Sequence, residues 1–108
     1  MFYQIVVCRI KSVSLFMKKL EKNQLNIILE FETTKKDHHV FKKHISFLQA
    51  ENRFINFIML LFKVANTKKW EKLVGQKVLL DIENNTVVAI GNYKEDFWLD
   101  FADFFEGE

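Results

Sequence analysis

The first half of the chain alternates between apolar and polar residues, a pattern typical of β-strands. Residues 3–17 alternate loosely and are rich in β-branched side chains, whereas residues 25–33 alternate more regularly. Residues 40–48 repeat the pattern. Short polar stretches at 18–24 and 34–37 separate the three runs and are typical of turns. The sequence therefore predicts a three-stranded antiparallel meander.

The periodicity becomes helical between residues 51 and 65. One apolar stripe is formed by Phe54, Phe57, Ile58, Leu61 and Ala65. It is widened by Ile55, Met59, Leu60 and Phe62. A helix that is apolar on so many sides must be covered on two of them. The meander provides one cover, and the other must come from elsewhere in the chain or from a second molecule.

Beyond this helix the pattern predicts a hairpin. Thr67 can cap a short helix, and Gly75 can end it in the left-handed conformation. Residues 77–82 and 86–90 are apolar and β-branched, and they flank a tight turn at residues 83–85.

The last segment of the chain is amphipathic. Placed on a helix, Asp96, Asp100 and Asp103 fall in one narrow stripe. The opposite side carries the aromatic residues Phe97, Trp98, Phe101, Phe104 and Phe105, which we expect to cover the apolar helix. The chain 1–108 is thus predicted to be a single α+β domain of order β-β-β-α-β-β with this amphipathic segment at its end.

The charges divide the chain into a basic and an acidic part. Residues 1–77 carry 15 Lys or Arg and 6 Asp or Glu, a net charge of +9, whereas residues 78–108 carry 1 and 8, a net charge of −7. The two parts could simply pack together and neutralise each other. Alternatively, carboxylates over an aromatic base could occupy a basic channel that normally holds phosphates. The candidate partner-binding residues are Glu95, Asp96, Trp98, Asp100, Asp103 and Glu106.

Catalytic and metal-binding patterns are weak. His44 and the run Asp37-His38-His39 lack the spacing of metal ligands, and we expect exposed turn residues and no metal or other cofactor. Glu30 and Glu32 share a strand face that we expect to be solvated. Cys8 is the lone cysteine, and we expect it to be a buried and inert thiol. The sequence shows neither a membrane-spanning segment nor the pattern of a signal peptide. It therefore predicts a non-enzymatic cytoplasmic protein.

The basic part allows a second hypothesis, binding of single-stranded nucleic acid. The candidate phosphate-binding residues are Lys35, Lys36, Lys42 and Lys43. Phe31, Phe41 and Phe47 lie close to them in the sequence and could act as stacking platforms for bases. Glu30 and Glu32 in the same predicted sheet weigh against it, so we rank nucleic acid below a protein partner.

Several segments resemble a family of small accessory proteins encoded by phages and mobile elements. The matching segments are the apolar helix, residues 70–78 (WEKLVGQKV), 87–92 (VVAIGN) and 96–98 (DFW). The chain departs from the family pattern at His39, where Gly is usual, and at Asn92, where His is usual. The resemblance implies an accessory protein rather than an enzyme. Such accessory proteins often block host defences, and some anti-CRISPR proteins do so with acidic surfaces.

Three hypotheses follow. The first is a phage or prophage inhibitor, an acidic nucleic-acid mimic, that binds a host defence protein such as a CRISPR effector in the bacterial cytoplasm. The second is a single-stranded nucleic-acid-binding accessory module. The third is a homodimer whose interface takes up the excess apolar surface of the helix at residues 51–65.

Overall fold

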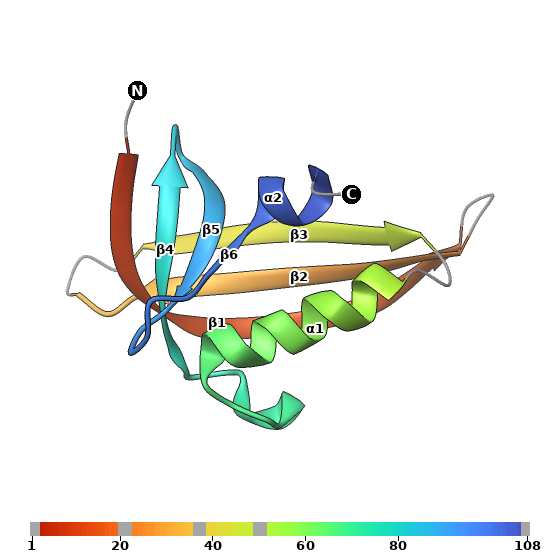
Figure 1. The fold of residues 1–108 in the computed structure, drawn as a ribbon, viewed down its shortest axis with the longest axis horizontal. Coiled ribbons are helices and arrows are strands. Elements are labelled where there is room, and N and C mark those ends of the chain that lie inside the picture. Colours follow the sequence, from red (N-terminus) through yellow and green to blue (C-terminus); the bar gives the residue numbers. More distant parts are fainter. Residues whose placement is uncertain (1–2, 20–22, 36–38, 49–51, 107–108) are drawn as a thin grey trace.

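In the computed structural model, residues 3–19, 23–35, 39–48 and 52–106 are described, and they form one curved sheet with helices on its concave side (Figure 1). The strands are β1 (Tyr3–Lys19), β2 (Asn23–Thr33), β3 (Val40–Leu48), β4 (Lys77–Glu83), β5 (Thr86–Asn92) and β6 (Trp98–Asp100). Their order across the sheet is β3-β2-β1-β4-β5-β6, and every neighbouring pair is antiparallel. Residues 20–22 and 36–38, which include parts of the two turns predicted at 18–24 and 34–37, lie outside the described residues.

The helical segments are α1 (Asn52–Ala65), a single 3₁₀ turn η1 (Trp70–Lys72) and a short α2 (Phe101–Glu106). The predicted α+β class is confirmed. The predicted order differs from the observed one after β5, where the chain forms β6 and α2 instead of one amphipathic element. No helix among the described residues has both the length and the apolar composition needed to cross a membrane.

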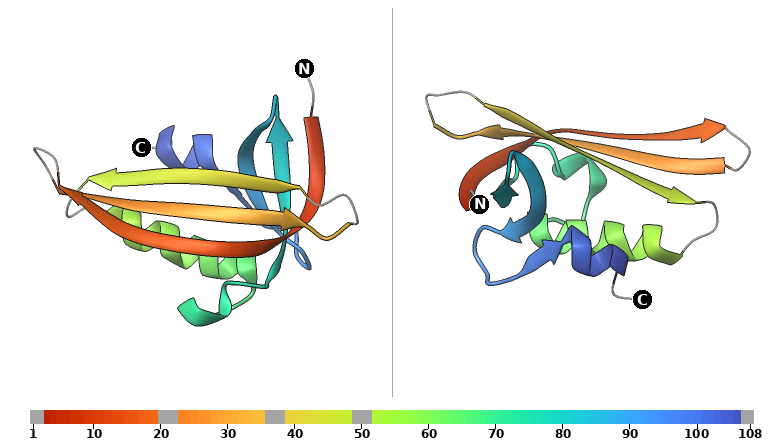
Figure 2. Two further views of the ribbon diagram at one scale, coloured as in Figure 1. Left: turned by 180° about the vertical axis from the view of Figure 1, so that it is seen from behind. Right: turned by 90° about the horizontal axis from the view of Figure 1, so that it is seen from above.

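β1 joins the two halves of the sheet. Its residues 3–9 pair with β4 and residues 8–19 pair with β2, and the register shifts between Ile10 and Ser12. A register shift of this kind bends a strand and increases its twist. The two halves therefore curl toward each other with α1 on the concave side (Figure 2). β3 and β5 come into contact, so the sheet forms a partly open barrel.

The hydrophobic core lies between α1 and the sheet. Phe57 of α1 is completely buried, and its ring centroid lies 5.5 Å from that of Phe47 on β3. The ring centroids of Phe101 and Phe104 on α2 lie 6.4 Å and 5.8 Å from the ring centroid of Phe57. The C-terminal segment thus covers one side of α1, as the sequence predicts for these two residues.

The described residues of the chain leave the outward face of α1 open. Ile55 and Met59 are 60% and 65% exposed. The second cover that the sequence predicts for this helix is therefore present only on the side where α2 packs. Trp98 was expected in the same aromatic cover but lies elsewhere, with its ring against Gly91 of the neighbouring strand β5. The side chain of Phe105 lies outside what the structure describes.

Turn residues occur where the sequence indicates them. Gly75 has a φ of 96° and ends the η1 segment in the left-handed region, as predicted. Asn84 and Asn85 have φ values of 51° and 65° and form the tight β4–β5 turn, also as predicted. Two successive residues with positive φ match the twist of the hairpin strands.

Replacing Gly91 with alanine is expected to destabilise the fold by about 1–3 kcal/mol. A Cβ at this position would lie 2.8 Å from three atoms of the Trp98 indole, so the ring must move. Urea unfolding of the wild type and the variant measures the loss. In a Trp98→Leu background the same change should cost much less, and an equal cost in both backgrounds would contradict the close approach.

Candidate functional site

The predicted acidic stripe does not form. Asp96 lies in the turn after β5, Asp100 is the last residue of β6, and Asp103 lies in the first turn of α2. The segment is extended rather than helical at Asp100 because β6 pairs with β5, a backbone interaction that helical periodicity cannot reveal. Asp100 Oδ1 also accepts a hydrogen bond from the Asp103 amide at 3.1 Å, so this carboxylate caps α2.

The other candidate partner-binding residues are dispersed. Glu95 is exposed in the same turn as Asp96, while Trp98 is 37% exposed beside Gly91. The side chain of Glu106 lies outside the described part of the chain. The acidic residues therefore surround the β6 strand instead of lining one helix face.

Asp100 lies across β5 from a second acid, Asp81 of β4, because both residues are paired with Ala89. The Asp81 Oδ1 atom is buried and has no hydrogen-bond partner among the described residues. Burial, and then the nearby Asp100 charge, raise the pKa of Asp81.

Replacing Asp81 with asparagine is expected to increase the free energy of unfolding at pH 7. Because the folded-state pKa is raised, the ionised group destabilises the fold as pH rises through that pKa, and the cost is absent below the unfolded pKa. The gain should therefore vanish near about pH 3. Urea unfolding at both pH values tests this, with exposed Asp96→Asn as the control. An equal gain at both pH values would contradict the assignment.

The predicted basic set is also divided. Lys42 and Lys43 point to opposite faces of β3, because successive strand residues alternate. The Lys43 Nζ lies 4.7 Å from the Phe101 ring centroid on the concave side, and burial lowers the pKa of this lysine. Lys35 lies at the rim of a cavity, and Lys36 lies outside the described residues.

The predicted stacking platforms belong to the interior. Phe31 and Phe47 are 0% and 1% exposed, and Phe41 is half-buried, because the curled sheet encloses this face. On the opposite face, Ser12 donates a 2.6 Å hydrogen bond to Glu30, and this bond lowers the pKa of Glu30. The expectation that these phenylalanines are available for bases is wrong for Phe31 and Phe47.

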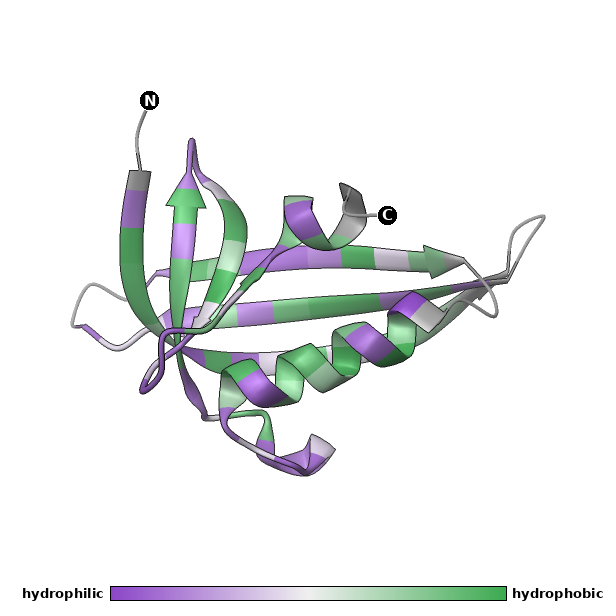
Figure 3. Cartoon of the chain, viewed as in Figure 1, coloured by the Kyte–Doolittle hydropathy of each residue, from purple (hydrophilic) through white to green (hydrophobic). Residues whose placement is uncertain are grey.

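A shallow cleft of about 710 Å³ lies at the C-terminal end of α1, and we call it the lysine cleft. Its lining residues are Phe62, Lys63, Asn66, Thr67, Lys68, Lys69, Lys72 and Glu95. Its four lysines are exposed and form no ion pair within the described ranges. Figure 3 shows the η1 segment beside this cleft as largely hydrophilic. The charge count of the sequence predicts a basic region. It does not predict that these four lysines lie around one cleft at the end of α1.

Asn92 organises one wall of the lysine cleft. Its buried side chain donates to the Lys63 carbonyl at 2.8 Å and to Asn66 Oδ1 at 2.9 Å. Its Oδ1 accepts the amides of Lys94 and Glu95 at 2.7 Å and 2.8 Å. Asn92 thus ties the end of α1 to the β5–β6 turn. A polar residue that ends the apolar run of β5 was the available sequence signal.

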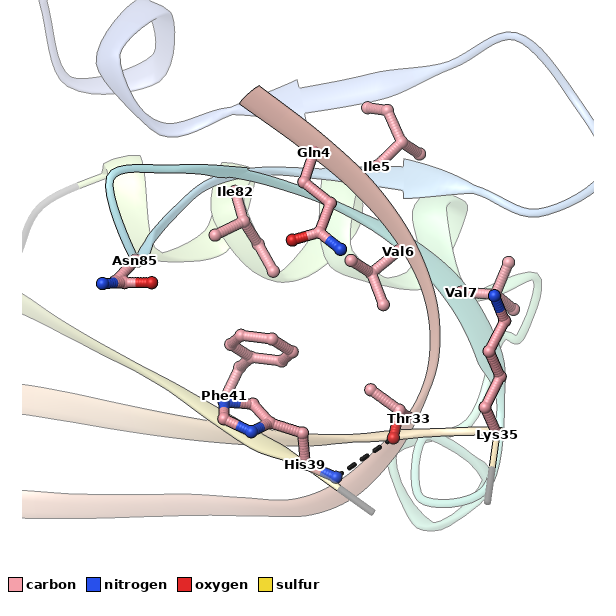
Figure 4. Close-up of a pocket in the computed structure, with 10 residues that line it drawn as sticks. All are labelled: Gln4, Ile5, Val6, Val7, Thr33, Lys35, His39, Phe41, Ile82 and Asn85. Carbon is pink, nitrogen blue, oxygen red and sulfur yellow. Dashed lines mark hydrogen bonds between the residues drawn. The ribbon is translucent and has the colours of Figure 1, made fainter. Parts of the chain in front are cut away.

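A second cavity, of about 460 Å³, opens at the end of the barrel where β1 begins, and we call it the mouth cavity (Figure 4). Its lining residues are Gln4, Ile5, Val6, Val7, Thr33, Lys35, His39, Phe41, Ile82 and Asn85. No pattern along the sequence indicates this cavity, because its walls come from β1, the β2–β3 turn, β3 and the β4–β5 hairpin.

The histidines do not form a metal site among the described residues. His44 Nε2 is hydrogen-bonded to Asn26 Oδ1 at 2.8 Å, whereas the His39 ring lies against Phe41. No group of three or more His, Cys, Asp or Glu side chains in the described ranges could hold a metal ion. Asp37 and His38 lie outside those ranges. Cys8 is completely buried, as predicted, and burial raises the pKa of its thiol to about 11.

Comparison of the chain with models of known protein families, with curated proteins and with solved structures finds no match. The resemblance to phage accessory proteins therefore stays a prediction. The function must be inferred from the lysine cleft, the mouth cavity and the dispersed acids.

Proposed function

We propose that this protein binds single-stranded nucleic acid through the lysine cleft. Four lysines line one cleft without ion pairs to described residues, and this clustering carries the proposal. Lysines that neutralise phosphates release condensed counterions, which makes binding favourable and dependent on salt.

The surroundings of the cleft suit a flexible strand. The Lys63 Nζ lies 4.2 Å from the Phe97 ring centroid, which positions one charge at the wall. Trp70 belongs to the same 3₁₀ turn as Lys72 and is 37% exposed. An exposed indole can stack on a base only where that base is unpaired, so the combination favours single strands over duplexes.

The strand order supports the same function. Strands β3-β2-β1-β4-β5, with α1 between β3 and β4 and a long bent β1, have the arrangement of the OB-fold. The OB-fold is a partly open five-stranded barrel that binds oligonucleotides and oligosaccharides. Because one fold serves many functions, this agreement adds to the lysine cleft and does not replace it.

The inhibitor hypothesis remains a separate proposal without a geometric argument of its own. Its acids are divided between a turn, a strand end and α2, and the half-buried Asp100 is engaged as a helix cap. The homodimer through α1 has the exposed Ile55 and Met59 in its favour.

The proposal is tested by fluorescence anisotropy with a labelled oligonucleotide of about 12 nucleotides, at about 50 and 200 mM salt. We expect the double variant Lys69→Gln/Lys72→Gln to weaken binding at least about tenfold and to reduce the magnitude of the salt slope by about 1.4. The matched control is Lys11→Gln/Lys42→Gln, which removes the same charge from the meander.

Three results would overturn the proposal. They are no binding by the wild type at low salt, equal losses in both double variants, and tighter binding of an acidic peptide than of the oligonucleotide. Equal losses in both double variants would indicate that nucleic acid binds to the meander or is attracted by net charge alone.

A further inference from the structure

The mouth cavity is separate from the lysine cleft. Asn85, at the tip of the β4–β5 hairpin, lines the cavity, whereas Asn92, at the other end of β5, organises the cleft. A ligand of the mouth cavity can therefore be tested without the lysines. The cavity volume of about 460 Å³ lies within the usual range for small-molecule sites, about 300–1,000 Å³.

The cavity walls are suited to a flat ring. Val6 and Ile82 provide aliphatic surface on one side, and Phe41 and His39 provide ring surface on the other (Figure 4). The two ring centroids are 4.6 Å apart with an interplanar angle of 54°. The His39 amide donates to Thr33 Oγ1 at 3.1 Å, which holds the start of β3 against the end of β2. Aromatic and aliphatic walls of this kind bind planar ligands through their faces.

Polar groups with free hydrogen-bonding capacity surround these walls. The side-chain amides of Gln4 and Asn85 form no hydrogen bond with any residue in the described part of the chain. Figure 4 shows the Gln4 amide pointing into the cavity. An amide presents a donor and an acceptor side by side, the arrangement that also occurs on the edges of nucleobases. Lys35 places a cation at the rim.

We propose that the mouth cavity binds a planar nitrogen heterocycle of the nucleobase class, with the ring between the two walls and its polar edge on Gln4. The ring arrives either as a free nucleoside or as an unpaired base of a strand. An aliphatic ligand would leave the Gln4 amide without a partner. A sugar lacks the two flat faces that the walls contact.

The test titrates adenosine, guanosine, cytidine and uridine into the full-length chain and follows the backbone and side-chain NMR signals. We expect saturable shifts at Gln4, Phe41 and Asn85 for at least one nucleoside. Gln4→Leu and Phe41→Leu should each weaken this binding at least about tenfold. The control is Val40→Ala, because Val40 neighbours Phe41 on β3, is 37% exposed and does not belong to the cavity lining. Gln4 is exposed, so its variant reports on binding even if Phe41→Leu lowers stability.

A second arm separates the two sources of the ring. An oligonucleotide shifts the Gln4 signal if the cavity takes an unpaired base, and an abasic oligonucleotide of equal length does not. If only free nucleosides shift it, the source is a small molecule, which also supports the proposal. Binding of ribose or glucose in place of nucleosides, or equal losses in Gln4→Leu and Val40→Ala, would overturn it.

The Lys69→Gln/Lys72→Gln variant distinguishes this inference from the proposed function. Nucleosides carry no phosphate, so their binding should be unchanged in that variant. Nucleoside binding without oligonucleotide binding would contradict only the lysine cleft. Oligonucleotide binding without any shift at Gln4, with nucleosides or with oligonucleotides, would contradict only the mouth cavity.

Discussion

Replacing Phe57 with alanine is expected to lower the free energy of unfolding by about 3–5 kcal/mol. Phe57 is completely buried and is the common neighbour of Phe47, Phe101 and Phe104. These three rings belong to β3 and α2, which are held by their own strand pairing and by helix capping. They cannot all move inward to fill the space, so the variant loses buried apolar surface and also retains a cavity.

Urea unfolding followed by circular dichroism measures this loss. The matched control is Met59→Ala on the same helix, since Met59 is 65% exposed and its removal should change stability by less than about 0.5 kcal/mol. A loss below about 1 kcal/mol for Phe57→Ala, or equal losses for both variants, would contradict the packing of α2 onto α1.

Replacing Asn92 with alanine is expected to destabilise the protein by about 2–4 kcal/mol. The change removes two donors, to the Lys63 carbonyl and to Asn66, and the acceptor of two backbone amides. A buried polar group left without a partner costs about 1–3 kcal/mol. All four bonds are only partly buried, so water can replace some of them in the variant and the total stays below the simple sum.

Hydrogen exchange gives this prediction a local measurement. The amides of Lys94 and Glu95 donate to Asn92 Oδ1 and should lose protection in the variant before the rest of the sheet does. Asn56→Ala is the control, because Asn56 is exposed on α1. Unchanged protection of both amides would show that Asn92 does not hold the turn. Weakened oligonucleotide binding in Asn92→Ala would follow from a disordered cleft wall.

Local patterns predicted those elements whose causes are local. Residues 25–33 alternate in the sequence, and Ile27, Leu29 and Phe31 are completely buried on one face of β2. The helix expected at 51–65 is observed at Asn52–Ala65, and Gly75 has the expected positive φ. Periodicity and turn chemistry depend on neighbours in the chain, so they can be found without knowing the fold.

Helical periodicity was misleading in the C-terminal segment. Asp96, Asp100 and Asp103 have helical spacing, but residues Trp98 to Asp100 pair with β5, which would otherwise be the edge strand of the sheet. Pairing with an edge satisfies backbone groups that a short isolated helix would leave partly unsatisfied. The helix is consequently limited to Phe101–Glu106 and begins at the Asp100 cap.

The sequence by itself determined the α+β class, the buried thiol of Cys8, the tight turn at residues 83–85 and the division into a basic and an acidic part, because each depends on composition or on adjacent residues. Only the tertiary structure decided which of these groups meet. Lys63 and Glu95 line one cleft, and Gln4 and Phe41 line one cavity, although each pair is more than 30 residues apart. Sites of this kind arise where the curled sheet and the end of α1 bring distant segments together, and no spacing along the chain records that approach.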